Sequence, residues 1–221
     1  MNITKENIDK LNARLDHGLT GGLGEPEPGK MCVEAAVCAA LGLPHGDNPG
    51  CVIGSLREIK ITLNDSDEWD SNKSRAEGLR RLAIAQIGSL GAIDEDEFMR
   101  RVVALTIRTL VPTALRVAAK KIGGERAQAL RDAADKCGAN PTEENARQAE
   151  EVTDGTGGIA AYNAVAAAAD ADGGALYATA RAVTYAARAT GNEKVLRDFA
   201  EDIVQILIDM NAPGCAWLEA K

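Results

Sequence analysis

Hydrophobic residues recur every three or four positions along most of the chain, which is the spacing of an amphipathic helix. In the first half this spacing predicts helices over residues 5–16, 30–41, 54–65 and 71–89. The first predicted helix carries Ile8, Leu11 and Leu15 on one face. Ser71 precedes the last of the four, where its hydroxyl can accept a hydrogen bond from a free backbone N–H group.

The second half continues the helical spacing. It predicts helices over residues 95–121, 124–136, 141–151, 158–170, 173–189 and 193–210. Pro112 predicts a kink or a break in the first of these, because proline cannot donate the hydrogen bond that a helix interior needs. Asn140, followed by a proline, predicts the start of the third. We expect the segment from Pro213 to fold back, so that Trp217 and Leu218 cover the core.

The fold class follows from this pattern and from the alanine content. No stretch alternates hydrophobic and polar residues over the length of a strand. Alanine supplies 39 of the 221 residues. We therefore predict an all-α fold, a compact bundle of nine or ten helices with alanine-rich C-terminal helices. Gly123 and Gly124 predict a boundary between a helical subdomain, 1–122, and an alanine-rich subdomain, 123–221, unless the chain forms one domain.

The charge of the chain restricts its partners. Lys and Arg number 25 against 33 Asp and Glu, which gives a net charge of −8. A chain of this charge repels a phosphate backbone at long range, so general nucleic-acid binding is not expected. No hydrophobic run approaches the roughly 18 residues that a membrane helix needs, so no membrane association is expected. The polar N-terminal segment is not typical of a signal peptide.

Five cysteines in a chain without an export signal indicate reduced thiols and a cytoplasmic location. The spacing of Cys32, Cys38, His45 and Cys51 resembles that of metal ligands. Structural zinc sites, however, use cysteines separated by two to four residues, whereas Cys32 and Cys38 face different sides of a helix. We therefore expect buried thiols, no metal and no cofactor.

A binding site for a small anion is predicted around the glycine-rich segment 18–30. This segment ends at Lys30 directly before a helix, where free backbone N–H groups can bind an anion. It is not a P-loop, because Met31 stands where that motif has Ser or Thr. A downstream cluster supplies further cations, an amide and an aromatic ring, namely Arg57, Lys60, Asn64, Trp69, Arg75, Arg80 and Arg81. In this hypothesis Lys30, Arg57, Arg75 and Arg80 hold charge, and Trp69 stacks on a base or sugar.

Three further residues, Glu34, His45 and Asp47, would contact the polar edges of the ligand. Each has an alternative interpretation. Glu34 could simply face solvent, or be held by Arg57 or Arg80. His45 could bond the turn that contains it, and the arginines could form ordinary surface ion pairs.

The leading hypothesis is a small-ligand-binding protein, a homodimer, that takes a nucleotide-derived anion. One alternative is a hydrolase that uses Cys32 and His45, since a cysteine at a helix N-terminus can have a lowered pKa. The other is an acidic interaction module that inhibits a host protein.

Four segments carry a resemblance to other proteins: PGKMCVEAAVCAALGLPHGDNPGCV, LNDSDEW, RRLAIAQIGS and APGCAWL. In these segments the chain resembles a group of uncharacterised bacterial and phage-type proteins that also have an alanine-rich second half. The resemblance implies accessory cargo of phages or mobile elements, acting against host defence in the bacterial cytoplasm. It implies no particular activity or catalytic residue.

Overall fold

The computed structural model describes residues 3–153, 163, 166 and 174–219. Over this part of the chain it contains nine α-helices and no strand, only an isolated bridge between Gly24 and Met31. The helices are α1 Lys5–Leu15, α2 Val33–Ala40, α3 Gly54–Asn64, α4 Asn72–Ala85, α5 Glu95–Ile122, α6 Gly124–Ala139, α7 Glu143–Thr153, α9 Ala175–Thr190 and α10 Lys194–Asp209, followed by the 3-10 helix η2 Pro213–Trp217. The predicted all-α fold is confirmed.

The chain forms two compact units. Unit 1 comprises residues 1–98 and 196–221, and unit 2 comprises residues 99–195. The chain therefore returns to unit 1 through α10, which begins at Lys194. The junction at residues 122–123, where the sequence predicts a boundary, is the turn between α5 and α6, both largely within unit 2.

The two units differ in net charge. Unit 1 has 12 Lys and Arg against 22 Asp and Glu, and unit 2 has 13 against 11. The formal charges are thus −10 for unit 1 and +2 for unit 2. The net −8 of the chain resides in unit 1.

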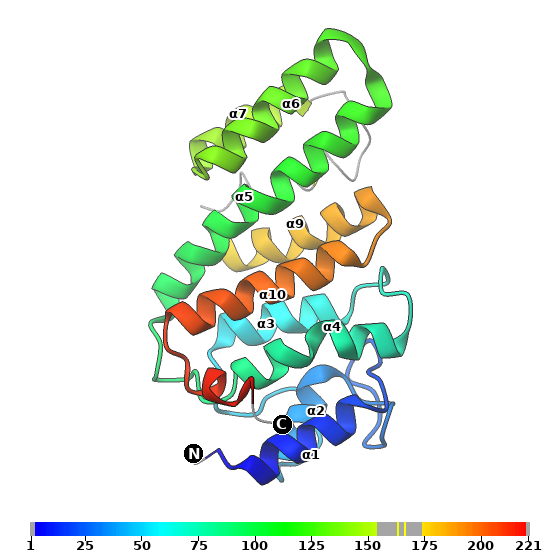
Figure 1. The fold of residues 1–221 in the computed structure, drawn as a ribbon, viewed down its shortest axis with the longest axis vertical. Helices are drawn as coiled ribbons and strands as arrows, with labels where there is room; N and C mark the ends of the chain where they lie inside the picture. Colours follow the sequence, from blue (N-terminus) through cyan, green and yellow to red (C-terminus); the bar gives the residue numbers. More distant parts are fainter. Residues whose placement is uncertain (1–2, 154–162, 164–165, 167–173, 220–221) are drawn as a thin grey trace. The chain divides into compact units, whose positions relative to one another are not determined.

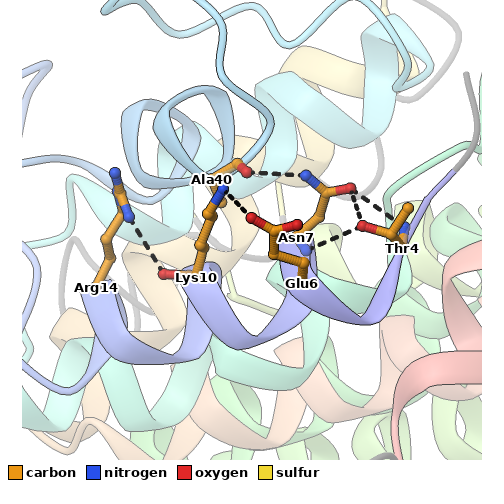
Figure 2. A network of polar contacts seen from close by, with 6 residues as sticks. All are labelled: Thr4, Glu6, Asn7, Lys10, Arg14 and Ala40. Atoms are coloured by element: carbon orange, nitrogen blue, oxygen red, sulfur yellow. Dashed lines mark hydrogen bonds and ion pairs between the residues drawn. The ribbon is translucent and has the colours of Figure 1, made fainter.

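Helix α1 begins with a reciprocal capping box. The backbone N–H of Asn7 donates to Thr4 Oγ1 at 3.3 Å, and the N–H of Thr4 donates to Asn7 Oδ1 at 3.2 Å. The same Asn7 side chain donates to the carbonyl of Ala40 at 3.1 Å, which joins the start of α1 to the end of α2 (Figure 2). Ile8, Leu11 and Leu15 are buried, as their spacing predicts.

Helix α4 begins where predicted, with Ser71 accepting a hydrogen bond from Ser74 in a second capping box. The ring of Trp69 packs against Gly78, where a Cβ atom would lie 2.5 Å from Trp69 Cη2. The terminal 3-10 helix packs on α4, and Gly214 is buried against the backbone of Ile84 and Ala85. The predicted fold-back of the C-terminal segment thus occurs, with Trp217 and Leu218 half-buried.

In unit 2, α6 and α7 lie side by side (Figure 1). The thiol of Cys137 on α6 donates to the carbonyl of Asn145 on α7 at 3.4 Å. Asn140 ends α6 instead of starting α7, because Thr142 accepts the hydrogen bond from Asn145 N–H at the start of the next helix. The prediction for Asn140 was therefore wrong. The helix predicted over 158–170 lies outside the described residues, apart from positions 163 and 166.

Helix α5 runs as one helix through Pro112, so the predicted alternative of a break is wrong. By length and composition alone α5 is the one helix in the described part of the chain that could cross a membrane. Of the residues in its most apolar window, 56% are buried inside the structure. The core helix of a soluble protein passes the same test, so the length and composition of α5 do not by themselves indicate a membrane span.

We predict that Gly78→Ala destabilises the protein by about 1–3 kcal/mol, because the added methyl group overlaps the Trp69 ring. The ring cannot easily withdraw, since Trp69 is buried and its Nε1 donates to the carbonyl of Leu63 at 2.7 Å. Urea unfolding measures the effect. Gly46→Ala is the control, with the nearest atom 4.0 Å from its Cβ, and should change stability by less than about 0.5 kcal/mol. Equal stability of the Gly78→Ala and Gly46→Ala variants would contradict close packing of the Trp69 ring on Gly78.

Candidate functional site

The glycine-rich segment 18–30 is an ordered loop whose backbone is hydrogen-bonded to its surroundings. The N–H of Leu19 donates to Asn72, that of Thr20 to Met31, and that of Glu25 to Lys30, at 2.8–2.9 Å. Gly24 has φ +70°, and a Cβ there would lie 1.9 Å from the carbonyl oxygen of Lys30. The chain passes itself so closely here that only glycine fits.

Asn64, the last residue of α3, joins this loop to the start of α2. Its Oδ1 accepts a hydrogen bond from the N–H of Val33 at 3.1 Å, and its Nδ2 donates to the carbonyl of Thr20 at 2.9 Å. The neighbouring Asp65 accepts from the N–H of Gly22 at 2.7 Å. The two hydrogen bonds described for the Asp65 side chain both end on its Oδ1 atom. One N-terminal N–H group of α2 and the Gly22 N–H group are thus already engaged, which removes them as anion donors.

A small cavity of about 70 Å³ lies where this loop, the start of α2, the end of α3 and the loop after α2 meet. We call it the loop cavity, lined by Gly22, Leu23, Cys32, Val33, Asp47, Ile61, Asn64 and Asp65. Two of its lining side chains are carboxylates and no lysine, arginine or histidine lines it. Its polar wall therefore accepts hydrogen bonds more readily than it donates them.

A fully buried ion pair lies in the same unit, on the helices that carry the cavity. Glu34 on α2 contacts Lys60 on α3, with 2.9 Å between Oε1 and Nζ and no exposed side-chain surface on either residue. Gln86, at the end of α4, donates from Nε2 to Glu34 Oε2 at 3.2 Å. The Nζ of Lys60 and the Oε1 of Gln86 make no well-directed hydrogen bond among the described residues. Three helices are thus joined at one charged cluster.

Burial dominates the ionisation of this pair. It raises the pKa of Glu34 and lowers that of Lys60, because a buried charge loses its hydration. The two opposite charges stabilise each other and oppose both shifts. Arg57 lowers the pKa of Glu34 further, and Asp47 raises it. The solvent-facing interpretation of Glu34 was wrong, and its described partner is Lys60 and not Arg57 or Arg80.

The predicted cations do not gather in one pocket. Lys30 is exposed and pairs with Glu25 and Glu27 at 3.2 and 2.9 Å. Arg57 pairs with its neighbour Glu58 at 2.5 Å.

Arg75 and Arg80 join helices and loops through hydrogen bonds. Arg75 donates to the carbonyl of Leu19 at 2.9 Å, and Arg80 donates to Asn12 and Asp16 on or next to α1 at 2.9 and 2.6 Å. Arg81, from the same cluster, pairs with Glu201 of α10 at 2.9 Å.

Trp69 and His45, which the sequence predicts as ligand contacts, also contact other parts of the protein. Trp69 is 6% exposed, and its hydrogen bond to Leu63 and packing on Gly78 make it part of the core. His45 is exposed, and its Nε2 lies 3.2 Å from the carbonyl oxygen of Gly24. Of the residues predicted for the ligand site, Asp47 and Asn64 line the loop cavity.

Cys32 also lines the loop cavity, as the N-terminal cap of α2. Its sulfur accepts a hydrogen bond from the N–H of Ala35 at 3.3 Å. Burial nevertheless raises the pKa of the Cys32 thiol, and this effect exceeds that of the backbone hydrogen bonds that lower it. No described hydrogen bond joins Cys32 to His45. The electrostatics thus favour a neutral thiol over an activated nucleophile.

The sequence contained a signal for the buried lysine. Lys60 lies four positions after Leu56 and three before Leu63, on the face of α3 that is otherwise apolar. A charged residue in that position indicates a buried cation that needs a carboxylate partner, but the spacing does not say which carboxylate that is. No comparable pattern marks Gln86 or Asp65, because their partners lie 52 and 43 positions away in sequence.

Among the residues that the structure describes, no group of three or more His, Cys, Asp and Glu side chains could hold a metal ion. Comparison of the chain with known proteins found no matching family model, no matching curated protein and no matching solved structure.

We predict that Lys60→Met lowers the free energy of unfolding by about 3–5 kcal/mol, because it leaves the Glu34 carboxylate buried without its partner. The double variant Glu34→Leu/Lys60→Met should lose much less than the sum of the two single variants. Urea unfolding of all four proteins measures the coupling.

Lys5→Met is the matched control, since Lys5 and Asp9 are also 2.9 Å apart but more than half exposed. It should cost at most about 1 kcal/mol. Equal costs for Lys5→Met and Lys60→Met would contradict a role for burial.

We further predict that Cys215 is the cysteine that iodoacetamide labels fastest, because it is half-buried and the other four are buried. The labelling rate of Cys32 should rise up to and beyond pH 9, since a raised pKa keeps the thiol protonated at lower pH. Mass spectrometry of the labelled peptides gives each rate. A hydrolase that uses Cys32 requires the opposite, with Cys32 fastest and its rate already level near neutral pH.

Proposed function

We propose that the protein binds a small ligand in the loop cavity, and that the ligand carries a primary ammonium or guanidinium group. The observation that carries this proposal is the composition of the cavity wall. Asp47 and Asp65 line it together with the buried Asn64, whereas the cations predicted for an anion are engaged elsewhere in unit 1. Carboxylates are the usual partners of such cationic groups.

The size of the cavity supports a small functional group. A volume of about 70 Å³ exceeds what one water molecule needs and is far below that of a typical drug-sized pocket. Leu23, which is 44% exposed, and Ile61 add an apolar wall that suits a short alkyl chain next to the cationic group.

The charge of unit 1 supports the same chemistry. Its net −10 raises the local concentration of cations and lowers that of anions around the site. The cationic ligand replaces the nucleotide-derived anion that the sequence suggested, because the described contacts of Lys30, Arg75 and Arg80 lie within the protein. Sequestration on behalf of a phage or mobile element stays a prediction from the resemblance.

A ligand screen with matched variants tests the proposal. Ethylamine, methylguanidine and 1,4-diaminobutane should raise the melting temperature, and adenosine phosphates should not. A ligand at a hundred times its dissociation constant adds about 2.7 kcal/mol to the stability of the folded state. Asp47→Asn should weaken amine binding about tenfold or more, as expected for loss of one charge-assisted hydrogen bond.

Asp67→Asn is the control variant. Asp67 is exposed, lies in the same unit and does not line the cavity, so its loss removes the same charge from elsewhere. Equal weakening by the two substitutions would show a general effect of charge and would overturn the assignment of the site. A rise in melting temperature with adenosine phosphates and not with amines would indicate that the site binds an anion.

A further inference from the structure

A row of aromatic and cationic side chains lies on α9 in unit 2, with Tyr177 exposed and Arg181 and Tyr185 half-buried. Tyr177, Arg181 and Tyr185 follow one another at intervals of four residues, so they share one face of the helix. The Cζ of Arg181 lies 5.4 Å from the ring centroid of Tyr177 and 5.5 Å from that of Tyr185. We call these three residues the tyrosine–arginine row.

Tyr177 of this row is exposed, unlike the other aromatic side chains that the structure describes. Tyr177 is 67% exposed, whereas Trp69, Phe98 and Phe199 are at most 6% exposed. The opposite face of α9 is packed, with Ala178, Ala182 and Ala186 among its buried residues. The row therefore stands on a helix that the core fixes, and core packing does not account for it.

Stacking against the two tyrosine rings orients the guanidinium group of Arg181 before a partner binds. A guanidinium group held against two rings loses less conformational freedom on binding than a free arginine side chain. A hydrogen bond with the side chain of Tyr185 raises the pKa of Arg181 and adds to the contacts of its guanidinium group. Tyrosine and arginine are the residue types that most often dominate the binding energy of protein interfaces.

Local charge indicates the partner. Every other described α-helix contains at least one Asp or Glu, whereas α9 contains Arg181 and Arg188 and no acidic residue. Unit 2 has a net charge of +2, in contrast to the −10 of unit 1. Within α9 itself, a partner that approaches this row thus meets two cations and no carboxylate, and charges farther than about 10 Å are screened.

We infer that the tyrosine–arginine row is a docking surface for an acidic segment of a partner protein. A carboxylate of the segment pairs with the N–H groups of Arg181, and apolar side chains next to it cover the rings of Tyr177 and Tyr185. The surface is independent of the loop cavity, which lies in unit 1. Self-pairing of the row across a two-fold axis is disfavoured, because it would bring two arginines together without a carboxylate from α9.

Fluorescence anisotropy with a labelled peptide rich in Glu and interspersed with Leu tests this inference on the full chain. The peptide should bind in a salt-sensitive way, and its counterpart with Gln in place of Glu should bind about tenfold more weakly or worse. Arg181→Gln should weaken binding of the acidic peptide about tenfold. Arg126→Gln is the matched control, because it removes the same charge from an exposed position on α6 of unit 2 and leaves α9 unchanged. It should change affinity less than about twofold.

Tyr177→Ala is a second variant, which leaves every charge in place and should also weaken binding. Circular dichroism melting curves confirm that each variant is folded. Equal affinities of Arg181→Gln and Arg126→Gln, or no binding of the acidic peptide, would overturn the inference. Light scattering examines a second copy as the occupant: a wild-type dimer that Arg181→Gln dissociates would likewise overturn it.

Discussion

The structure of unit 1 depends on a pair of opposite charges placed in its interior. Glu34 and Lys60 come from different helices, and neither side chain has exposed surface. Each alone would be strongly unfavourable in that position, because a buried ion loses its hydration. The pair therefore permits one arrangement of α2 against α3, in which the two charges meet. Gln86 extends the same constraint to α4 through its hydrogen bond to Glu34. An apolar pair could be as stable, but it would specify the arrangement less strictly.

The loop cavity follows from the same arrangement. Once α2 and α3 are paired, the end of α3 lies beside the start of α2, where Asn64 bonds to Val33. The loop before α2 is then held by Asn64 and Asp65, which bond to the backbone of Thr20 and Gly22. The cavity is thus a consequence of charged packing in the core and hydrogen bonds at the helix ends. Its acidic wall suits a cation, in keeping with the charge of the unit around it.

The two units present different surfaces. Unit 1 contains the whole negative excess of the chain, and unit 2 contains the helix that has arginines but no carboxylates. The net charges of the first and second halves of the sequence do not show this contrast between the units, because the last 26 residues of the chain belong to unit 1. The distribution of charge in the folded chain therefore separates a surface for cations from a surface for acidic segments.

The sequence by itself determined the fold class and most helices, since these depend on local spacing and capping. Ile8, Leu11 and Leu15 are buried as their spacing indicates, and Ser71 caps α4. Periodicity says which face of a helix is buried, but not which helix covers that face. Tertiary structure alone decided that Trp69 packs on Gly78, that Arg80 reaches α1, and that the partner of Glu34 is Lys60. These contacts join positions far apart in the chain or fit particular shapes, and residue spacing carries no information on either.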